Sequence, residues 1–389
     1  MHTPSTPGRS KRRRTLLAGV AAAASVFLAA CSAGSAPAES EAGAEGELTP
    51  ITLQLQWFAQ GQFAGYYAAL EQGFYEEAGL DVTIAEGGAD IVPQTALADG
   101  AADFAIAWVP KALASREQGA MITDVAQIFQ RSGTLQVSMA DAGIESVADL
   151  EGRNVGSWGF GNEFELFAAL TAAGLDPMTD VTLVQQAFDM SGLLAGDIDA
   201  AQAMTYNEYA QLLESVNPET GELYTAEDFS VLDWNDEGTA MLQDAIWAAS
   251  DRLEDPEFEA TTVAFIQASI EGWIYARDNP EETAQLVVDA GSQLGASHQA
   301  WMVNETNALV WPAEGGIGMI DEAAWDQTVE IAMNTTNQDG ATVLTAEPDE
   351  GAWTNEYVEQ ALAALEAEGV DITGADFAPT EVELQEGGQ

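Results

Sequence analysis

Cysteine and histidine, the side chains that most often bind transition metals or act as nucleophile and base, are nearly missing from this chain. The 389 residues include one cysteine, Cys31, and two histidines, His2 and His298. A single cysteine forms no intrachain disulfide and no Cys-x-x-Cys site. One histidine beyond the N-terminal region builds neither a histidine-based metal cluster nor a Ser-His-Asp triad. We therefore expect no catalytic residue, no bound metal and no cofactor.

Positively charged residues are also scarce. Lys and Arg number 11 against 64 Asp and Glu, and five of the 11 lie in the first 14 residues, which hold no acid. The rest of the chain has a formal charge near −58, and Lys111 is its one lysine. Such a charge repels nucleic acid and anionic lipid, so we expect no nucleic-acid partner. Attraction of a cationic partner would also fit, but solubility in a salty environment is the simpler interpretation.

The first 30 residues have the pattern of an export signal. Arg9 and the basic run Lys11–Arg14 precede the apolar run Leu16–Ala30, which is too short and too rich in small residues for an ordinary membrane-spanning helix. The run ends in Leu28-Ala29-Ala30-Cys31, which resembles the bacterial lipobox. We expect residues 1–30 to be a signal peptide and Cys31 to be lipidated. The protein would then be anchored to the cell membrane on its extracytoplasmic face.

Two points stay open in this region. Cys31 could instead follow a plain signal peptide or be a buried thiol. The pair Arg13-Arg14 allows twin-arginine export as well as the general secretory route. Residues 31–47, rich in Ala, Gly, Ser and Glu, are expected to form a flexible tether.

From residue 48 onward, short apolar runs alternate with helical patterns, which is typical of an α/β fold. The predicted strands are Ile51–Trp57, Leu80–Ala85, Asp103–Trp108, Ile122–Phe129, Leu135–Met139, Asn154–Trp158, Val181–Val184, Ala200–Met204 and Ala245–Ala249. The chain after Phe258 is mostly helical. We divide it into domain 1 (residues 48–139 and 240–370), domain 2 (residues 140–239) and a polar tail (residues 371–389) that we expect to be frayed.

Several short segments resemble one family of solute-binding proteins. They are Leu55–Phe58, Gly65–Ala69, Gly73–Val82, Gly100–Phe104 and Asp149–Gly156. In their order and spacing they resemble the ABC-transporter solute-binding proteins related to thiamine-pyrimidine-precursor binding and to the yeast thiamine pyrimidine synthase. Within that family, Leu55–Tyr67, Trp158–Leu166 and Gln202–Tyr209 are most similar to riboflavin-binding subunits of bacterial riboflavin importers.

The resemblance implies a type II periplasmic-binding-protein clamshell, in which two α/β domains joined by two hinge crossings hold the ligand between them. It implies a monomer that captures a small aromatic heterocycle and passes it to an ABC permease. Riboflavin is favoured, and a thiamine pyrimidine precursor of the formylaminopyrimidine or hydroxymethylpyrimidine type is the alternative. A pyrimidine synthase is the alternative of another class. The yeast relative is associated with an iron centre, a consumed histidine and a Cys-rich motif, for which this chain lacks the residues.

Ligand contacts are expected where strands end, because α/β sheets bind ligands at the carboxyl ends of their strands. Four loops qualify, at Trp57–Phe63, Trp108–Lys111, Trp158–Phe164 and Thr205–Asn207, and Gly87–Asp90 is a weaker fifth. The predicted ligand-binding residues are Trp57, Phe63, Asp90, Trp108, Trp158, Phe160, Asn162, Glu163, Phe164, Tyr206 and Asn207. Their aromatic rings would stack on a planar heterocycle, and their amides and carboxylates would pair with its polar edge. Nitrate or a sulfonate would instead call for cations and hydroxyls.

Many of these residues also have a purely structural interpretation. Trp57 and Trp108 end predicted strands and Phe164 lies on the apolar face of a helix, so all three could belong to the core. Asn162 could serve only as a helix N-cap, and Tyr206 with Asn207 could merely begin a helix. The sequence leaves both interpretations open.

Overall fold

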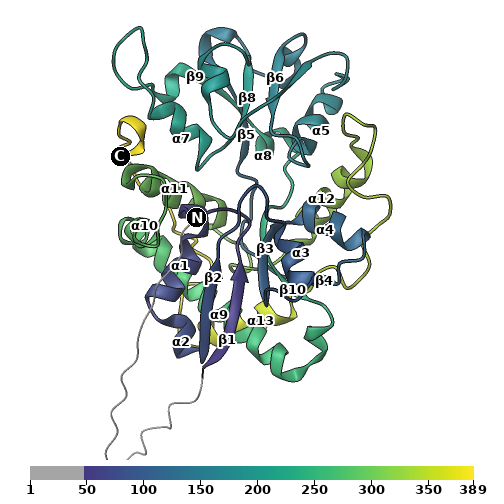
Figure 1. The fold of residues 1–389 in the computed structure, drawn as a ribbon, viewed down its shortest axis with the longest axis vertical. Helices are drawn as coiled ribbons and strands as arrows, with labels where there is room; N and C mark the ends of the chain where they lie inside the picture. The colour runs from purple at the N-terminus through teal and green to yellow at the C-terminus, as the bar shows by residue number, and fades with distance from the viewer. Residues whose placement is uncertain (1–47) are drawn as a thin grey trace, which may run out of the picture. The chain divides into compact units, whose positions relative to one another are not determined.

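Two five-stranded mixed sheets, each covered by helices, form two α/β domains in the computed structural model (Figure 1). The structure describes residues 48–389, so the expected signal peptide, Cys31 and the tether lie outside the described residues. The strands of the first sheet, in spatial order, are β2 (Leu80–Ala85), β1 (Thr49–Gln54), β3 (Phe104–Trp108), β10 (Asp244–Ala249) and β4 (Ile122–Gln127). The strands of the second are β7 (Thr182–Gln185), β6 (Asn154–Ser157), β8 (Ala200–Met204), β5 (Thr134–Met139) and β9 (Phe229–Asp233).

The helices of the first domain come from both ends of the described chain. They are α1 (Ala64–Glu71), α2 (Phe74–Glu77), α3 (Pro93–Ala98), α4 (Val109–Glu117), α9 (Pro256–Asp278), α10 (Pro280–Asp289), α11 (Ala296–Val310), α12 (Glu322–Asn334) and α13 (Glu356–Ala367). The second domain carries α5 (Phe164–Ala172), α6 (Ser191–Leu194), α7 (Glu208–Leu213) and α8 (Trp234–Glu237). The first domain is therefore assembled from two separate stretches of sequence.

Alternating side chains of the first sheet enter two separate cores. Phe104 and Ile106 of β3 belong to the core that α9 and α11 cover, whereas Ala105 and Ala107 face the core that α3, α4 and α12 cover. Phe104 stacks on Phe265 of α9 with ring centroids 4.2 Å apart. Because both faces of β3 are buried, its sequence is a continuous run of apolar residues.

The two sheets share one topology. In each sheet, the first two strands are parallel to each other and to the third. The fourth strand is antiparallel to the third, and the chain enters it from the other domain. This strand is β10 in the first sheet and β5 in the second. The chain thus crosses between domains twice, after β4 and after β9. Because β5 pairs with β8 and β9, domain 1 ends before Thr134, and the predicted boundary at Met139 was placed too late. β9 was missed, because the sequence before it predicted a polar loop and no strand was predicted after that loop.

Side-chain hydrogen bonds join the two hinge crossings. The Oε1 atom of Gln243 accepts from the backbone N–H of Gly133 at 2.8 Å, and its Nε2 atom donates to the hydroxyls of Ser132 and Thr134. The amide of Asn235 pairs with the backbone of Ser132 in both directions. Paired amides satisfy buried backbone groups that leave the sheets at this point.

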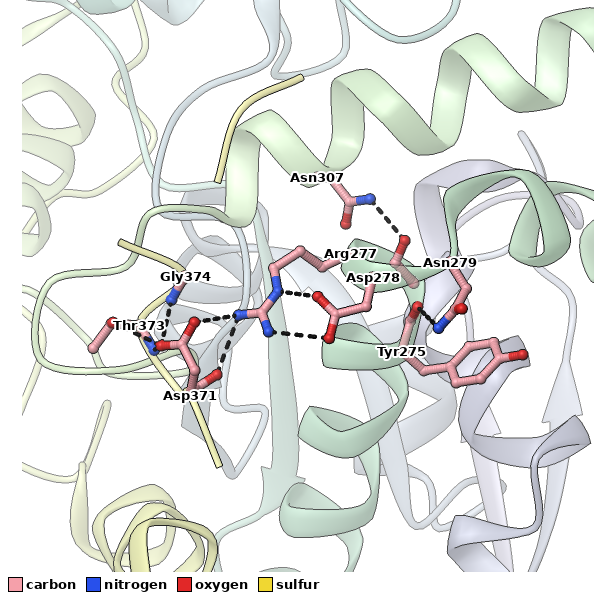
Figure 2. A network of polar contacts seen from close by, with 9 residues as sticks. Tyr275, Arg277, Asp278, Asn279, Asn307, Asp371, Thr373 and Gly374 are labelled. Atoms are coloured by element: carbon pink, nitrogen blue, oxygen red, sulfur yellow. Dashed lines mark hydrogen bonds and ion pairs between the residues drawn. The ribbon is translucent and has the colours of Figure 1, made fainter. Parts of the chain in front are cut away.

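The C-terminal tail is ordered, and the predicted fraying is wrong. Arg277 at the end of α9 donates to Asp371 at 3.1 Å and to Asp278 at 2.8 Å (Figure 2). Its guanidinium lies 4.7 Å from the ring centroid of Trp311. Further along, Thr380 donates to Asn304 of α11, and the carbonyl of Gln389 accepts from the N–H of Ser297. The polar residues of the tail therefore serve as partners for the surfaces of two helices.

Replacing Gln243 with Leu should lower the free energy of unfolding by about 1–3 kcal/mol, because the N–H of Gly133 would stay buried without a partner and the hydroxyls of Ser132 and Thr134 would each lose one hydrogen bond. Urea denaturation followed by tryptophan fluorescence measures the change. The matched control is Gln285→Leu, on the exposed face of α10, which should shift stability by less than about 0.5 kcal/mol. Equal stability of the two variants would show that the crossings do not depend on this amide.

Candidate functional site

A cleft of about 950 Å³ separates the two domains of the described chain. Four strands deliver side chains to it from their carboxyl ends, as the topology requires. The loops after β1 and β3 supply Trp57 and Trp108 from the first domain, and the loops after β6 and β8 supply Trp158 and Tyr206 from the second. The volume is at the upper end of the range typical of small-molecule sites.

Three aromatic rings form a wall that spans both domains. Phe188, in the loop after β7, lies 5.1 Å from Trp57 and 6.1 Å from Trp158, measured between ring centroids. The rings of Phe188 and Trp158 are nearly parallel, at 27°. Phe188 is 50% exposed, although a large apolar side chain is normally buried. An exposed ring between two tryptophans is the arrangement that a flat aromatic ligand can use for stacking.

A buried carboxylate forms the polar floor on the first domain. Asp244, the first residue of β10, accepts hydrogen bonds from Gln56 at 2.6 Å and Trp108 at 2.8 Å on Oδ1, and from Gln62 at 2.9 Å on Oδ2. Burial raises the pKa of Asp244 to about 7, and the three donors and nearby Lys111 oppose that rise. The floor is therefore a network of polar groups in an otherwise apolar surrounding.

Lys111 crosses the cleft. Its Nζ atom donates to Oδ1 of Asn162 in the second domain at 2.8 Å and lies 4.7 Å from the ring centroid of Trp108. Burial lowers the pKa of Lys111 to about 8, while the carboxylates of Glu163 and Asp244 favour its charged form. This contact joins the two rims in the arrangement that the structure shows.

The rim of the second domain is conformationally unusual. Gly159, Phe160 and Gly161 have φ values of 66°, 56° and 89° in succession. A positive φ on a bulky residue is strained, and such strain clusters at functional sites. The side chain of Phe160 is 89% exposed at the mouth of the cleft. The glycines on either side permit the loop to hold this ring out toward solvent.

A polar network lies behind the opposite wall. Asn207 donates to Glu208 at 2.9 Å and contacts Nε2 of His298 at 3.0 Å, while Nδ1 of His298 lies 2.9 Å from Glu214. Both ring nitrogens are thus held by oxygen atoms of the second domain. Because His298 belongs to α11 of the first domain, the network links the domains directly. Burial raises the pKa of Glu208 to about 7.

Glu165 supports the second hinge crossing. It lies on α5, and its Oε1 atom accepts from the backbone N–H of Met241 at 2.8 Å. Burial raises its pKa to about 7, and hydrogen bonds from Met241, Ser132 and Thr134 oppose the rise. The carboxyl group therefore titrates near neutral pH at the hinge.

Most of the predicted ligand-binding residues line the cleft. They are Trp57, Trp108, Trp158, Phe160, Asn162, Glu163, Phe164, Tyr206 and Asn207. Phe63 and Asp90 are not among the lining residues: the turn Gly61–Phe63 directs the ring of Phe63 into the core, where it is fully buried, and Asp90 is exposed beside the lining residues Ala89 and Ile91. Contact of the nine with a ligand stays a prediction.

Sequence reasoning missed several lining residues. Gln56, Gln60 and Gln62 flank the predicted Trp57, and Phe188 follows a predicted strand, so the rule of strand ends could have found all four. Asp244, which lies beneath the lining residues Gln56, Gln62 and Trp108, gave no such signal, because it is at the start of its strand and not at the end. The segment 337–343 after α12, which adds Asn337, Gln338, Asp339, Thr342 and Val343 to the cleft, gave none either.

No metal site or membrane span is found in residues 48–389. Within them, no group of three or more His, Cys, Asp or Glu side chains could hold a metal ion. None of the helices described there has the length and apolarity needed to cross a membrane.

The fold is that of the periplasmic binding proteins. The chain superposes on the periplasmic aliphatic sulphonate-binding protein of Escherichia coli with a TM-score of 0.56 at 17% identity, covering 72% of this chain and 90% of that one. At this identity the likeness concerns the fold, and it confirms the predicted clamshell of two α/β domains.

The chain belongs to the NMT1/THI5-like family, whose model matches residues 60–283. It is 28% identical to the riboflavin-binding protein of Chloroflexus aurantiacus, over 86% of this chain and 95% of that protein. It is 25% identical to the formylaminopyrimidine-binding protein of Halalkalibacterium halodurans, over 68% and 75%. A further relative, 23% identical over 63% of this chain and 74% of its own length, is a Legionella pneumophila 4-amino-5-hydroxymethyl-2-methylpyrimidine phosphate synthase. The resemblance predicted from sequence is confirmed.

Stability should fall as the pH rises from about 4 to about 7, because carboxyls with a raised pKa bind protons in the folded state that they have lost in the unfolded chain. Glu165→Gln removes one such group and retains an acceptor for Met241. Relative to the unaltered protein, the variant should gain more unfolding free energy at pH 8 than at pH 5. The difference between the two gains should be roughly 2 kcal/mol. The control Glu330→Gln, on the exposed face of α12, should show no such pH dependence. Parallel pH curves for Glu165→Gln and the unaltered protein would contradict this.

Proposed function

We propose that the protein captures a planar heterocycle, riboflavin in the first place, in the cleft between its domains and delivers it to an ABC importer. The observation that carries the proposal is the aromatic wall of Trp57, Phe188 and Trp158, which both domains build together. A ligand stacked on this wall touches both domains and therefore favours their closed arrangement, by as much as its affinities for the open and closed states differ.

The size of the wall favours a flavin over a pyrimidine. A three-ring isoalloxazine can contact several of the aromatic side chains at once, whereas a single pyrimidine ring covers about one of them. Each aromatic contact adds about 0.5–1.5 kcal/mol beyond the burial of area. The volume of about 950 Å³ leaves room for the ribityl chain beside the rings. The riboflavin-binding relative supports the same choice, and the formylaminopyrimidine-binding relative keeps the pyrimidine as the second candidate.

The chemistry of the cleft disfavours a small anion. Among its lining residues, Lys111 is the one cation, and its Nζ atom already donates to Asn162. The same lining carries the acids Glu163, Glu208 and Asp339. An anion would meet repulsion from these carboxylates without a guanidinium to offset it.

The lining also disfavours a synthase. It contains neither cysteine nor histidine, so the cleft lacks the thiol and the imidazole that would serve such an enzyme as nucleophile or iron ligand. His298 touches Asn207 from behind the wall and is held by Glu214, which suits a structural link between the domains. We therefore interpret the protein as a carrier that releases its ligand unchanged.

Riboflavin should quench the tryptophan fluorescence of the purified protein, and be quenched itself, in a saturable one-to-one titration with a Kd of about 1 μM or tighter. Trp57→Leu should weaken binding at least about tenfold, because it removes one ring of the wall. The control Trp353→Leu replaces a tryptophan that packs against Trp325 away from the cleft, and it should leave the Kd unchanged.

A parallel titration with a formylaminopyrimidine and with taurine separates the alternatives. Tight binding of the pyrimidine without a response to riboflavin would move the proposed function to the uptake of thiamine precursors. Tight binding of taurine would contradict the proposal of a heterocycle ligand altogether.

We further propose that the protein is a lipoprotein on the extracytoplasmic face of the membrane, anchored through Cys31. In a bacterial host, the unaltered chain should take up radiolabelled palmitate and sediment with membranes. Cys31→Ser should lose the label, because the thiol that carries the lipid is gone. Ser32→Ala next to it is the matched control and should keep the label. Labelling of the Cys31→Ser variant would contradict the anchor.

A further inference from the structure

The carboxylate of Asp244 fixes the orientation of the glutamine amides on the floor of the cleft. A carboxylate only accepts hydrogen bonds, so Gln56 and Gln62 must turn their NH₂ groups toward it. The Oε1 atom of Gln62 is then free to accept from Nε2 of Gln60, which lies 2.7 Å away. Hydrogen bonds therefore connect Asp244 to Gln62 and Gln62 to Gln60, and the orientation of each of these amides is determined.

The outward atoms of this network are two amide oxygens. With one N–H of each NH₂ group held in this network, Gln56 and Gln60 each retain an Oε1 atom that accepts no hydrogen bond from residues 48–389. Both residues line the cleft, as does Gln62 between them. The indole N–H of Trp108, which also lines the cleft, is already spent on Asp244.

We propose that Asp244 is a positioning residue that sets Gln56 and Gln60 as paired hydrogen-bond acceptors, so that the site selects ligands whose polar edge carries N–H or O–H donors. This inference rests on the proposed binding of a planar heterocycle and specifies which edge is recognised. In a flavin, the imide N–H of the pyrimidine-like ring is such a donor, and the ribityl hydroxyls are others. A ligand edge made of acceptors alone would face the two oxygens unfavourably.

Asp244→Asn tests the chain of amides, because its effect has a predictable direction. The indole of Trp108 can only donate, so the oxygen of the new amide stays with Trp108 and Gln56. Its NH₂ group then faces Gln62, which must turn to offer Oε1. The turned Gln62 then directs its NH₂ group at Gln60, so the amide of Gln60 must also turn to offer its Oε1 atom. The outward atom of Gln60 changes from an acceptor to a donor.

The first measurement needs no ligand. In ¹⁵N-labelled protein, the side-chain amide signals of Gln62 and Gln60 should both move in Asp244→Asn, while those of Gln185 stay in place. Gln185 is a matched internal control, since it lines the same cleft and donates to the carbonyl of Trp158. Thermal melting checks that the variant is folded. Unchanged signals of Gln60 in a folded variant would overturn the positioning role.

The second measurement compares riboflavin with 3-methylriboflavin, which lacks the imide N–H. The unaltered protein should bind riboflavin about tenfold more tightly, because a buried acceptor left without a donor weakens binding. In the double variant Gln56→Met/Gln60→Met this ratio should fall to about twofold or less. The control Gln118→Met/Gln360→Met alters two exposed glutamines that do not line the cleft and should keep the full ratio.

The outcomes separate the two claims. Riboflavin binding with equal affinity for both flavins would overturn the acceptor pair and leave the proposed function standing. Absence of riboflavin binding would overturn the proposed function, and the amide signals would still decide whether Asp244 orients Gln60. A full ratio retained in Gln56→Met/Gln60→Met would also overturn the inference, since another group would then recognise the imide.

Discussion

The burial of one carboxylate, that of Asp244, is the constraint on which the site depends. A buried carboxylate is tolerated only when donors surround it. Here the donors come from the loop after β1 and from the end of β3, so two loops and the start of β10 are fixed relative to one another. Since β10 is the strand that returns from the second domain, the same interaction ties the hinge to the floor of the cleft.

The rest of the site follows from how the second domain meets this floor. Phe188 approaches Trp57, Asn162 receives Lys111, and Asn207 contacts His298, so three separate points of the second domain touch the first. The indole N–H of Trp301 also donates to the carbonyl of Thr205 at 3.0 Å, and the hinge crossings are held by several hydrogen bonds. A ligand that adds contacts to both rims shifts the balance toward closure.

The sequence allowed the fold and most of the cleft wall to be predicted, because both depend on local patterns. Apolar runs locate the strands, and strand ends locate Trp57, Trp108, Trp158 and Tyr206. The errors over β5, the tail and Asp244 have one common cause, which is contact between residues distant in sequence. β5 belongs to the second sheet because of its partners, the tail is ordered because α9 and α11 offer it partners, and Asp244 meets Gln56 across 188 residues. Local periodicity carries no information about such pairings.

A crystal structure of the protein grown with riboflavin tests the central claim most directly, because that claim is one of place and orientation. We expect the isoalloxazine to lie in the cleft, stacked against the aromatic wall of Trp57, Phe188 and Trp158, with its imide edge toward the oxygens of Gln56 and Gln60. A flavin bound elsewhere, or one whose imide edge faces solvent while these oxygens contact nothing, would contradict it.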